Sequence, residues 1–95
     1  MAIDSPRAVF VTRETDYELL LARHATRGQA KFFLDTRGQD IAVLEDRHRR
    51  FHATLQAARA AVPGDWRQAI VARTDLDRFL FAPEDVIVVV GQDGL

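Results

Sequence analysis

The sequence predicts an α/β domain in three layers, in which helices flank a small parallel sheet. Two short apolar runs, Ala8–Thr12 and Val86–Val90, have the length and β-branched content of strands. Val86–Val90 shows no polar alternation, which is typical of a strand inside a parallel sheet that is covered on both faces. The segments between the two runs have helical periodicity. Alternation of strands and helices favours parallel strands with right-handed crossovers.

The composition narrows the class of protein further. The length of 95 residues suits one domain spanning 1–95, and the apolar (47%) and charged (28%) fractions are ordinary for globular proteins. With 13 basic and 14 acidic side chains, a general nucleic-acid binder is not expected. The sequence contains no cysteine, which excludes disulfides and cysteine–zinc sites. No apolar run approaches the roughly 18–20 residues that span a bilayer, and Met1–Arg7 does not resemble a signal peptide. We therefore expect a cytoplasmic protein without a membrane partner.

The expected strand Ala8–Thr12 leads into a first helix. Thr15 or Asp16 can cap its N-terminus by accepting a hydrogen bond from the backbone. Gly28 is expected to close it in the left-handed conformation that glycine adopts most easily. One face of this helix carries Tyr17, Leu20, Leu21 and His24.

A second short helix is expected to end before Gly38, with Ala30, Phe33 and Leu34 on one face. The tetrad Thr-Arg-Gly-Gln occurs twice, at residues 26–29 and 36–39. We interpret both copies as helix stops. The alternative is a pair of arginine loops that grip a phosphate.

The longest helix is predicted to run from Ile41 to about Ala61, with Asp40 as its N-cap. Pro63-Gly64-Asp65 ends it. A second strand is expected within Ala69–Ala72, and one or two helical turns over Asp75–Phe79. The residues through which the long helix should cover one face of the sheet are Leu44, His48, Phe51 and Leu55.

The resulting order of elements predicts a Rossmann-like arrangement. Val86–Val90 is expected to lie inside the sheet, flanked by Ala8–Thr12 and by the strand near Ala69–Arg73.

The strongest chemical signal follows the last strand, at Gly91-Gln92-Asp93-Gly94. Ligands of open parallel sheets bind outside the carboxyl ends of the strands. A glycine pair there allows backbone amides to approach a phosphate. An acid between the glycines can hold a metal or accept a proton from an attacking hydroxyl. A plain tight turn is the alternative, because Asp-Gly is common in turns.

The segment Val88–Leu95 resembles the strand and loop of the NAD kinase and diacylglycerol kinase superfamily, in which a hydrophobic strand leads into Gly-Gly-Asp-Gly-Thr. Two of the five loop positions differ here, at Gln92 and Leu95. The segments Val11–His24 and Asp77–Asp85 also resemble bacterial NAD kinase-like proteins. The resemblance implies the amino-terminal α/β domain of a longer protein. In the family a β-rich domain follows, and the active site lies between the two domains.

This resemblance implies an ATP-dependent phosphotransferase that phosphorylates a hydroxyl, NAD being one possible acceptor. Asp93 would be the catalytic acid that activates the acceptor hydroxyl, while Gly91, Gln92 and Gly94 would line the nucleotide phosphates. ATP and Mg²⁺ are expected for the longer protein, whereas the isolated fragment should be inactive and need no cofactor. A non-catalytic nucleotide-binding or protein-interaction domain is the alternative, which the departures at Gln92 and Leu95 favour.

Arg13 follows the first strand and should open into the same crevice, as a phosphate contact or as a solvated loop arginine. His48 and His52 lie four residues apart and could meet one metal ion, with Glu45 adding an oxygen ligand. Packing of both histidines beside the apolar stripe is the favoured interpretation, so no metal site is assigned.

Two surface features remain. The arginines at 47, 49 and 50 are more typical of a solvated, self-paired helix face than of a nucleic-acid contact. Phe79–Phe81 is expected to pack in the core or at a strand edge. In the resembling family the chain after the motif covers the preceding strand, so we expect an exposed face of Val86–Val90 here, together with Phe79–Phe81. Such a patch predicts a two-fold homodimer.

Overall fold

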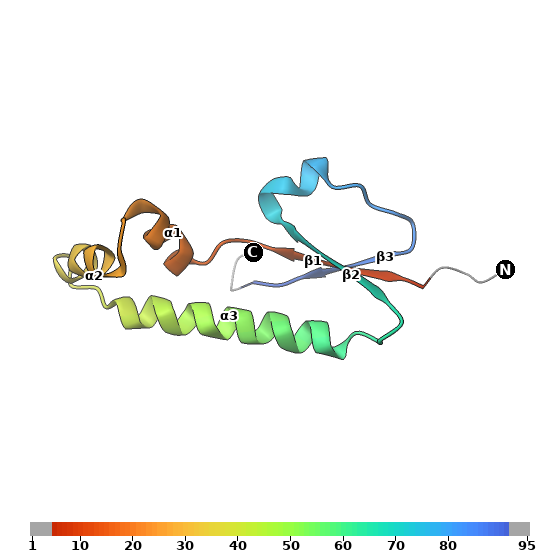
Figure 1. The fold of residues 1–95 in the computed structure, drawn as a ribbon, viewed down its shortest axis with the longest axis horizontal. Coiled ribbons are helices and arrows are strands. Elements are labelled where there is room, and N and C mark those ends of the chain that lie inside the picture. The colour runs from red at the N-terminus through yellow and green to blue at the C-terminus, as the bar shows by residue number, and fades with distance from the viewer. Residues whose placement is uncertain (1–4, 92–95) are drawn as a thin grey trace. The chain divides into compact units, whose positions relative to one another are not determined.

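The computed structural model describes residues 5–91, and its strands form one three-stranded parallel sheet (Figure 1). The strand order is β2-β1-β3, and β1 pairs in parallel with both neighbours. The expectation of an α/β chain with a small parallel sheet is confirmed. The elements are β1 (Arg7–Thr12), α1 (Asp16–Arg23), α2 (Arg27–Asp35), α3 (Ile41–Ala61), β2 (Arg67–Ala72), the 3₁₀ helix η1 (Arg73–Arg78) and β3 (Asp85–Val89).

The chain divides into two compact units. The sheet unit contains the described residues up to Arg13 and from Thr54 onwards, and the helical unit contains Glu14–Ala53. The boundary falls inside α3, which contributes residues to both units.

The central strand of the sheet is β1, so the predicted position of Val86–Val90 between the other two strands is wrong. Val9 and Phe10 are fully buried, whereas Ile87 and Val89 on β3 are 55% and 59% exposed. Ala8–Thr12 lacks polar alternation just as Val86–Val90 does, and strands of either run can be buried on both faces. The local sequence pattern therefore does not show which of the two runs is the more buried. β1 is the more buried strand because it lies at the centre of the sheet, between β2 and β3.

Elements of the sheet unit lie against both faces of β1. Val9 and Val11 point to one face, where with Val71 they pack against Leu76 and Phe79. Gln68 pairs with Ala8 and so shares the other face. Its side chain exchanges hydrogen bonds of 3.1 Å with Arg59 in the last turns of α3. In Figure 1, η1 and the last turns of α3 accordingly lie on opposite sides of the strands.

The helical unit has its own small core. Leu20 of α1 and Leu34 of α2 pack with Ile41 at the start of α3. Leu44 packs against this cluster, and His48 shares a hydrogen bond with Thr15 of the same unit. The prediction that Leu44 and His48 cover the sheet is therefore wrong. The reason is length: 21 helical residues span about 31 Å and six strand residues only about 20 Å. The first half of α3 therefore packs in the core of the helical unit and not on the sheet.

The predicted bounds of α3, Ile41 to Ala61, are confirmed, as is Asp40 at its start. The Asp40 carboxylate accepts a hydrogen bond of 2.9 Å from the Ala42 N–H. Within residues 5–91, no helix combines the length and the apolar character needed to cross a bilayer.

The first Thr-Arg-Gly-Gln tetrad begins a helix and the second ends one. The prediction of a helix stop is therefore wrong for residues 26–29 and confirmed for residues 36–39. Thr26 begins α2, its hydroxyl accepting from the Gln29 N–H at 3.1 Å. Gly28 therefore lies inside α2 and does not close α1, which ends at Arg23. Thr36 ends α2, and Gly38 turns the chain with a φ of 69°. A threonine hydroxyl can cap a helix start or bond back to its last turn, and the tetrad alone does not choose between them.

An ion pair joins the beginnings of β1 and β3. Arg7 donates to the two carboxylate oxygens of Asp85 at 2.9 and 2.6 Å, and its guanidinium lies 5.1 Å from the ring centre of Phe79. These hydrogen bonds from Arg7 hold the pKa of Asp85 below its usual value.

We expect the free energy of unfolding to decrease as the pH falls below about 4, the pKa of an unperturbed aspartate. Because the pKa of Asp85 is lower in the folded state, the pair stabilises the fold fully above that pH and less as the carboxyl protonates. Urea denaturation across the acid range measures this dependence. Asp85→Asn should flatten it, while Asp65→Asn, at an exposed turn position, should not. An unchanged slope in Asp85→Asn would contradict the role of the pair.

Candidate functional site

The first candidate site lies at the carboxyl edge of the sheet. In the register of the strands Thr12 pairs with Ala72, and Val11 pairs with Val89. The Val90 N–H donates to the Val11 carbonyl at 3.0 Å, so β1 and β3 stay side by side to their ends. Because the strands are parallel, the residues that follow them leave the sheet at one edge.

Two of the residues predicted for this site are placed together by that register. Arg13 follows β1, Gly91 comes directly after Val90, and both are exposed. Gln92, Asp93 and Gly94 lie outside the described residues, so their roles stay predictions.

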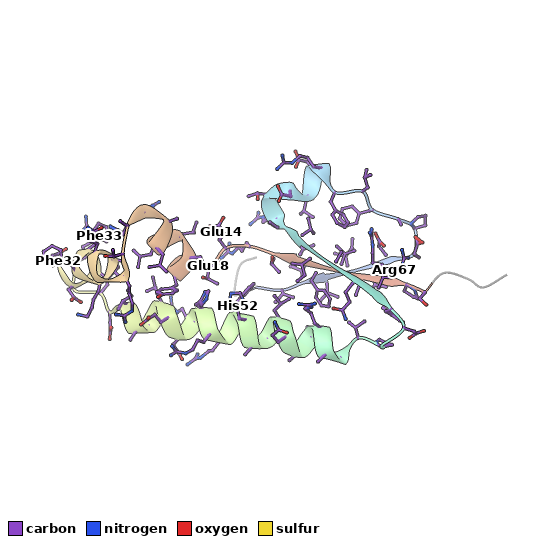
Figure 2. All side chains as sticks on the ribbon, viewed as in Figure 1. Glu14, Glu18, Phe32, Phe33, His52 and Arg67 are labelled. Carbon is purple, nitrogen blue, oxygen red and sulfur yellow. The ribbon has the colours of Figure 1, made fainter. Side chains whose placement is uncertain are left out.

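The second candidate site is a cluster of three potential metal ligands in the helical unit. Glu18 comes from α1, and His48 and His52 come from one face of α3. Glu18 Oε1 lies 3.8 Å from His48 Nδ1 and 4.0 Å from His52 Nε2. One donor atom from each residue lies within 4.8 Å of the other two. Figure 2 shows Glu18 and His52 on neighbouring elements of this unit.

Residues that cap the N-terminus of α1 make hydrogen bonds to the cluster. Thr15 is the N-cap: its hydroxyl accepts from the Glu18 N–H at 3.2 Å, and its own N–H donates to Glu18 Oε1 at 3.0 Å. The same hydroxyl shares a hydrogen bond of 2.8 Å with His48 Nδ1. The Tyr17 ring packs against His48, with 5.2 Å between the ring centres. The capping residues thus orient both Glu18 and His48.

Glu45, which the sequence suggests as a third ligand beside the two histidines, is hydrogen-bonded to other residues. It accepts two hydrogen bonds from Arg27, at 2.9 and 2.8 Å, and one from the Tyr17 hydroxyl at 3.2 Å. The hydrogen bonds from Arg27 hold the pKa of Glu45 below its usual range. Helical spacing identifies neighbours on one helix only. Glu18 comes from another helix, and the signal that could have placed it is the capping pattern of Thr15 followed three residues later by glutamate.

Four arginines of the helical unit make contacts within it. Asp46 pairs with Arg50 at 2.6 Å and with Arg49 at 3.8 Å, as expected of a self-paired helix face. Of the two tetrad arginines, Arg27 pairs with Glu45, and Arg37 lies over the Phe33 ring at 3.8 Å. These contacts favour a structural role for the tetrads over phosphate-gripping loops.

Thr15→Ala is expected to lower the free energy of unfolding by about 1–2 kcal/mol, because it removes an N-cap. Thr15 is also buried, and its hydroxyl is the hydrogen-bond partner of His48. Urea denaturation followed by circular dichroism gives the value. Thr15→Ser keeps the hydroxyl and should stay much closer to the unsubstituted protein. Equal losses in the two variants would show that the hydroxyl is not what matters.

Comparisons with protein-family models, curated proteins and solved structures find no match for this chain. Support for a function therefore comes from the residues of the two candidate sites.

Proposed function

We propose that this chain binds the phosphates of a nucleotide at the carboxyl edge of its sheet, as the Rossmann-like amino-terminal part of a phosphotransferase resembling NAD kinase. The observation that carries the proposal is the register that ends β1 and β3 side by side, with Arg13 and Gly91 exposed after them. In open parallel sheets this edge is where ligands bind. An arginine fork matches the oxygens of a phosphate, and a glycine lets a ligand approach the backbone.

In this proposal the remaining roles follow from the resemblance of the segment after β3. Asp93 accepts the proton of the acceptor hydroxyl, and Gly91, Gln92 and Gly94 line the phosphates of ATP. Arg13 and Gly91 are of residue types that suit phosphate oxygens, and Asp93 is a carboxylate of the kind that Mg²⁺ prefers. Bound Mg²⁺ would neutralise phosphate charge during transfer, and positioning by the chain would supply the rest of the rate.

Arg13→Ala is expected to weaken binding of ATP with Mg²⁺ about tenfold or more, because a hydrogen bond to a charged group contributes about 1.5–3 kcal/mol. Isothermal titration calorimetry gives the affinity, and amide chemical shifts locate the site. The matched control is Arg47→Ala, which removes an exposed arginine of α3 in the helical unit. Equal affinities in both variants, or shifts confined to the helical unit, would refute the proposed site.

Catalysis is tested separately from binding. Asp93→Asn should leave the fold intact, because the change is nearly isosteric, and should abolish phosphoryl transfer by the longer protein of which this chain is proposed to be part. Binding without transfer in the unsubstituted longer protein would instead indicate a non-catalytic nucleotide-binding domain.

We also propose that a second copy of the chain covers β3. This strand pairs on one side only within the described sheet, and Ile87 and Val89 are exposed on it. Leu80 is 87% exposed and Phe81 is 44% exposed just before the strand. Neighbouring exposed apolar residues mark association sites, and an edge strand is a template for pairing.

Light scattering after size exclusion is expected to give a dimer mass at tens of micromolar. Ile87→Lys should shift the population towards monomer, because a charge on an edge strand opposes pairing. A mass of 10.7 kDa for the unsubstituted chain would refute the dimer.

A further inference from the structure

We propose that Glu18, His48 and His52 bind one divalent transition-metal ion of the zinc type. All three residues belong to the helical unit, and none of them belongs to the proposed phosphate site. Two imidazole nitrogens and one carboxylate oxygen form a donor set that zinc uses in proteins. Side-chain exposures of 40% for Glu18, 26% for His48 and 45% for His52 leave the three groups accessible to an ion from solvent.

The distances suit a shared ion after small adjustments. A tetrahedral zinc with bonds of about 2.0–2.1 Å holds its ligand atoms about 3.3 Å apart. Glu18 Oε1 lies 3.8 Å from His48 Nδ1 and 4.0 Å from His52 Nε2, so these two gaps must close by about 0.5 and 0.7 Å. The two histidine nitrogens lie within 4.8 Å of each other and must approach as well. Rotation of the half-exposed side chains can supply this movement while the helices stay in place.

The backbone positions of the ligands are already fixed. His48 and His52 lie one helical turn apart, with their ring centres separated by 4.4 Å. Thr15 holds the His48 ring and, through the capping box, the Glu18 carboxylate. In metal sites the orienting hydrogen bond is made by the ring nitrogen that does not bind the ion, whereas Thr15 bonds to His48 Nδ1, so an ion at Nδ1 must displace the Thr15 hydroxyl. The helical spacing of the histidines and the hydrogen bond to Glu18 are in place before an ion arrives, and the exchange of the Thr15 hydroxyl for the ion is the rearrangement that binding requires.

The chemistry of the three groups also selects the type of ion. Nitrogen donors suit zinc, nickel and cobalt, whereas magnesium prefers an all-oxygen shell. The competing carboxylate of Glu45 is occupied by Arg27, which leaves Glu18 as the anionic ligand of the cluster. Three protein ligands leave one tetrahedral position for water, which is the arrangement of zinc sites that bind further ligands.

Calorimetric titration of the tag-free chain with Zn²⁺ at neutral pH tests the proposal. We expect one site per chain, and we expect Co²⁺ at the same site to give the intense visible absorption of a tetrahedral complex. His52→Gln and Glu18→Gln should each weaken Zn²⁺ binding at least tenfold. Glutamine at position 18 can preserve the capping box, so this variant removes the charged ligand and retains the cap. His24→Gln is the matched control, since His24 packs on Phe33 outside the cluster.

A second measurement separates metal binding from misfolding. Zn²⁺ should raise the thermal denaturation midpoint of the unsubstituted chain and of His24→Gln, because an ion that binds the folded state stabilises it. The two ligand variants should melt cooperatively without metal and gain little when it is added. No binding to the unsubstituted chain, equal binding in all four proteins, or a loss in His24→Gln alone would overturn the proposal. In the first case the cluster is only a hydrogen-bonded cap.

Discussion

Phe10→Ala is expected to lower the free energy of unfolding by about 3–5 kcal/mol, the cost of emptying a phenylalanine site in a packed core. Phe10 is fully buried, and it lies on the central strand opposite Ile70 on one side and Val88 on the other. The cavity would touch all three strands. Since a small domain has about 5–15 kcal/mol in total, this one change should remove much of the stability of the sheet unit.

The fluorescence of Trp66 measures this loss during urea denaturation. It is the single tryptophan of the chain and directly precedes β2. Ile70→Ala is the control, because that side chain is apolar but 48% exposed on β2, away from the proposed dimer contact on β3. It should cost far less. Equal costs would mean that β1 is not the buried centre of the sheet.

Leu34→Ala is the corresponding test of the helical unit, with an expected loss of about 2–5 kcal/mol. Leu34 is 3% exposed and packs with Leu20, Ala30 and Ile41. Phe32→Ala is a demanding control: it removes a larger apolar side chain two residues away on α2, but one that is 71% exposed. A larger loss in Phe32→Ala would contradict the observed orientation of α2.

Amide hydrogen exchange shows how far the effect of Leu34→Ala extends. The two units share α3, and small domains usually unfold in one step. We therefore expect faster exchange in α1, α2 and the sheet together. Faster exchange confined to residues 14–53 would show that the helical unit opens independently.

Local signals in the sequence are sufficient for the longest helix and for the presence of the strands, but not for the boundary between α1 and α2. The apolar stripe and Asp40 predicted α3 with its observed bounds, because periodicity and capping act within a few residues. Gly38 was identified for the same reason. The short runs around Phe10 and Val88 were recognised as strands, and their parallel pairing is confirmed.

Two of the missed features depend on residues that are distant in the sequence, and the third depends on the residues next to a repeated tetrad. The burial of β1 and the exposure of β3 follow from strand order, which neither run encodes locally. Thr26 and Thr36 occupy identical tetrads, and only their surroundings make one a helix start and the other a helix end. Glu18 reaches the histidines because two helices meet, so spacing along α3 indicated Glu45 instead. The carboxyl edge of the sheet as the place of the phosphate site could be predicted, because the carboxyl ends of parallel strands lie at the same edge of a sheet.

The pairing of β1 has a consequence for how the chain is made. Arg7 bonds to Asp85, a residue 78 positions later, and the partner strand β2 also lies beyond all three α-helices. Ribosomes add about 5–20 residues per second, so β1 emerges several seconds before either of its neighbours. The helices need only microseconds to form. During synthesis the apolar segment Arg7–Thr12 thus lacks the strands that pair with it in the folded protein, and unpaired apolar segments of high β-propensity aggregate readily. A chaperone at the ribosome exit would meet this segment before β2 and β3, and its release would have to wait until β3 has been made.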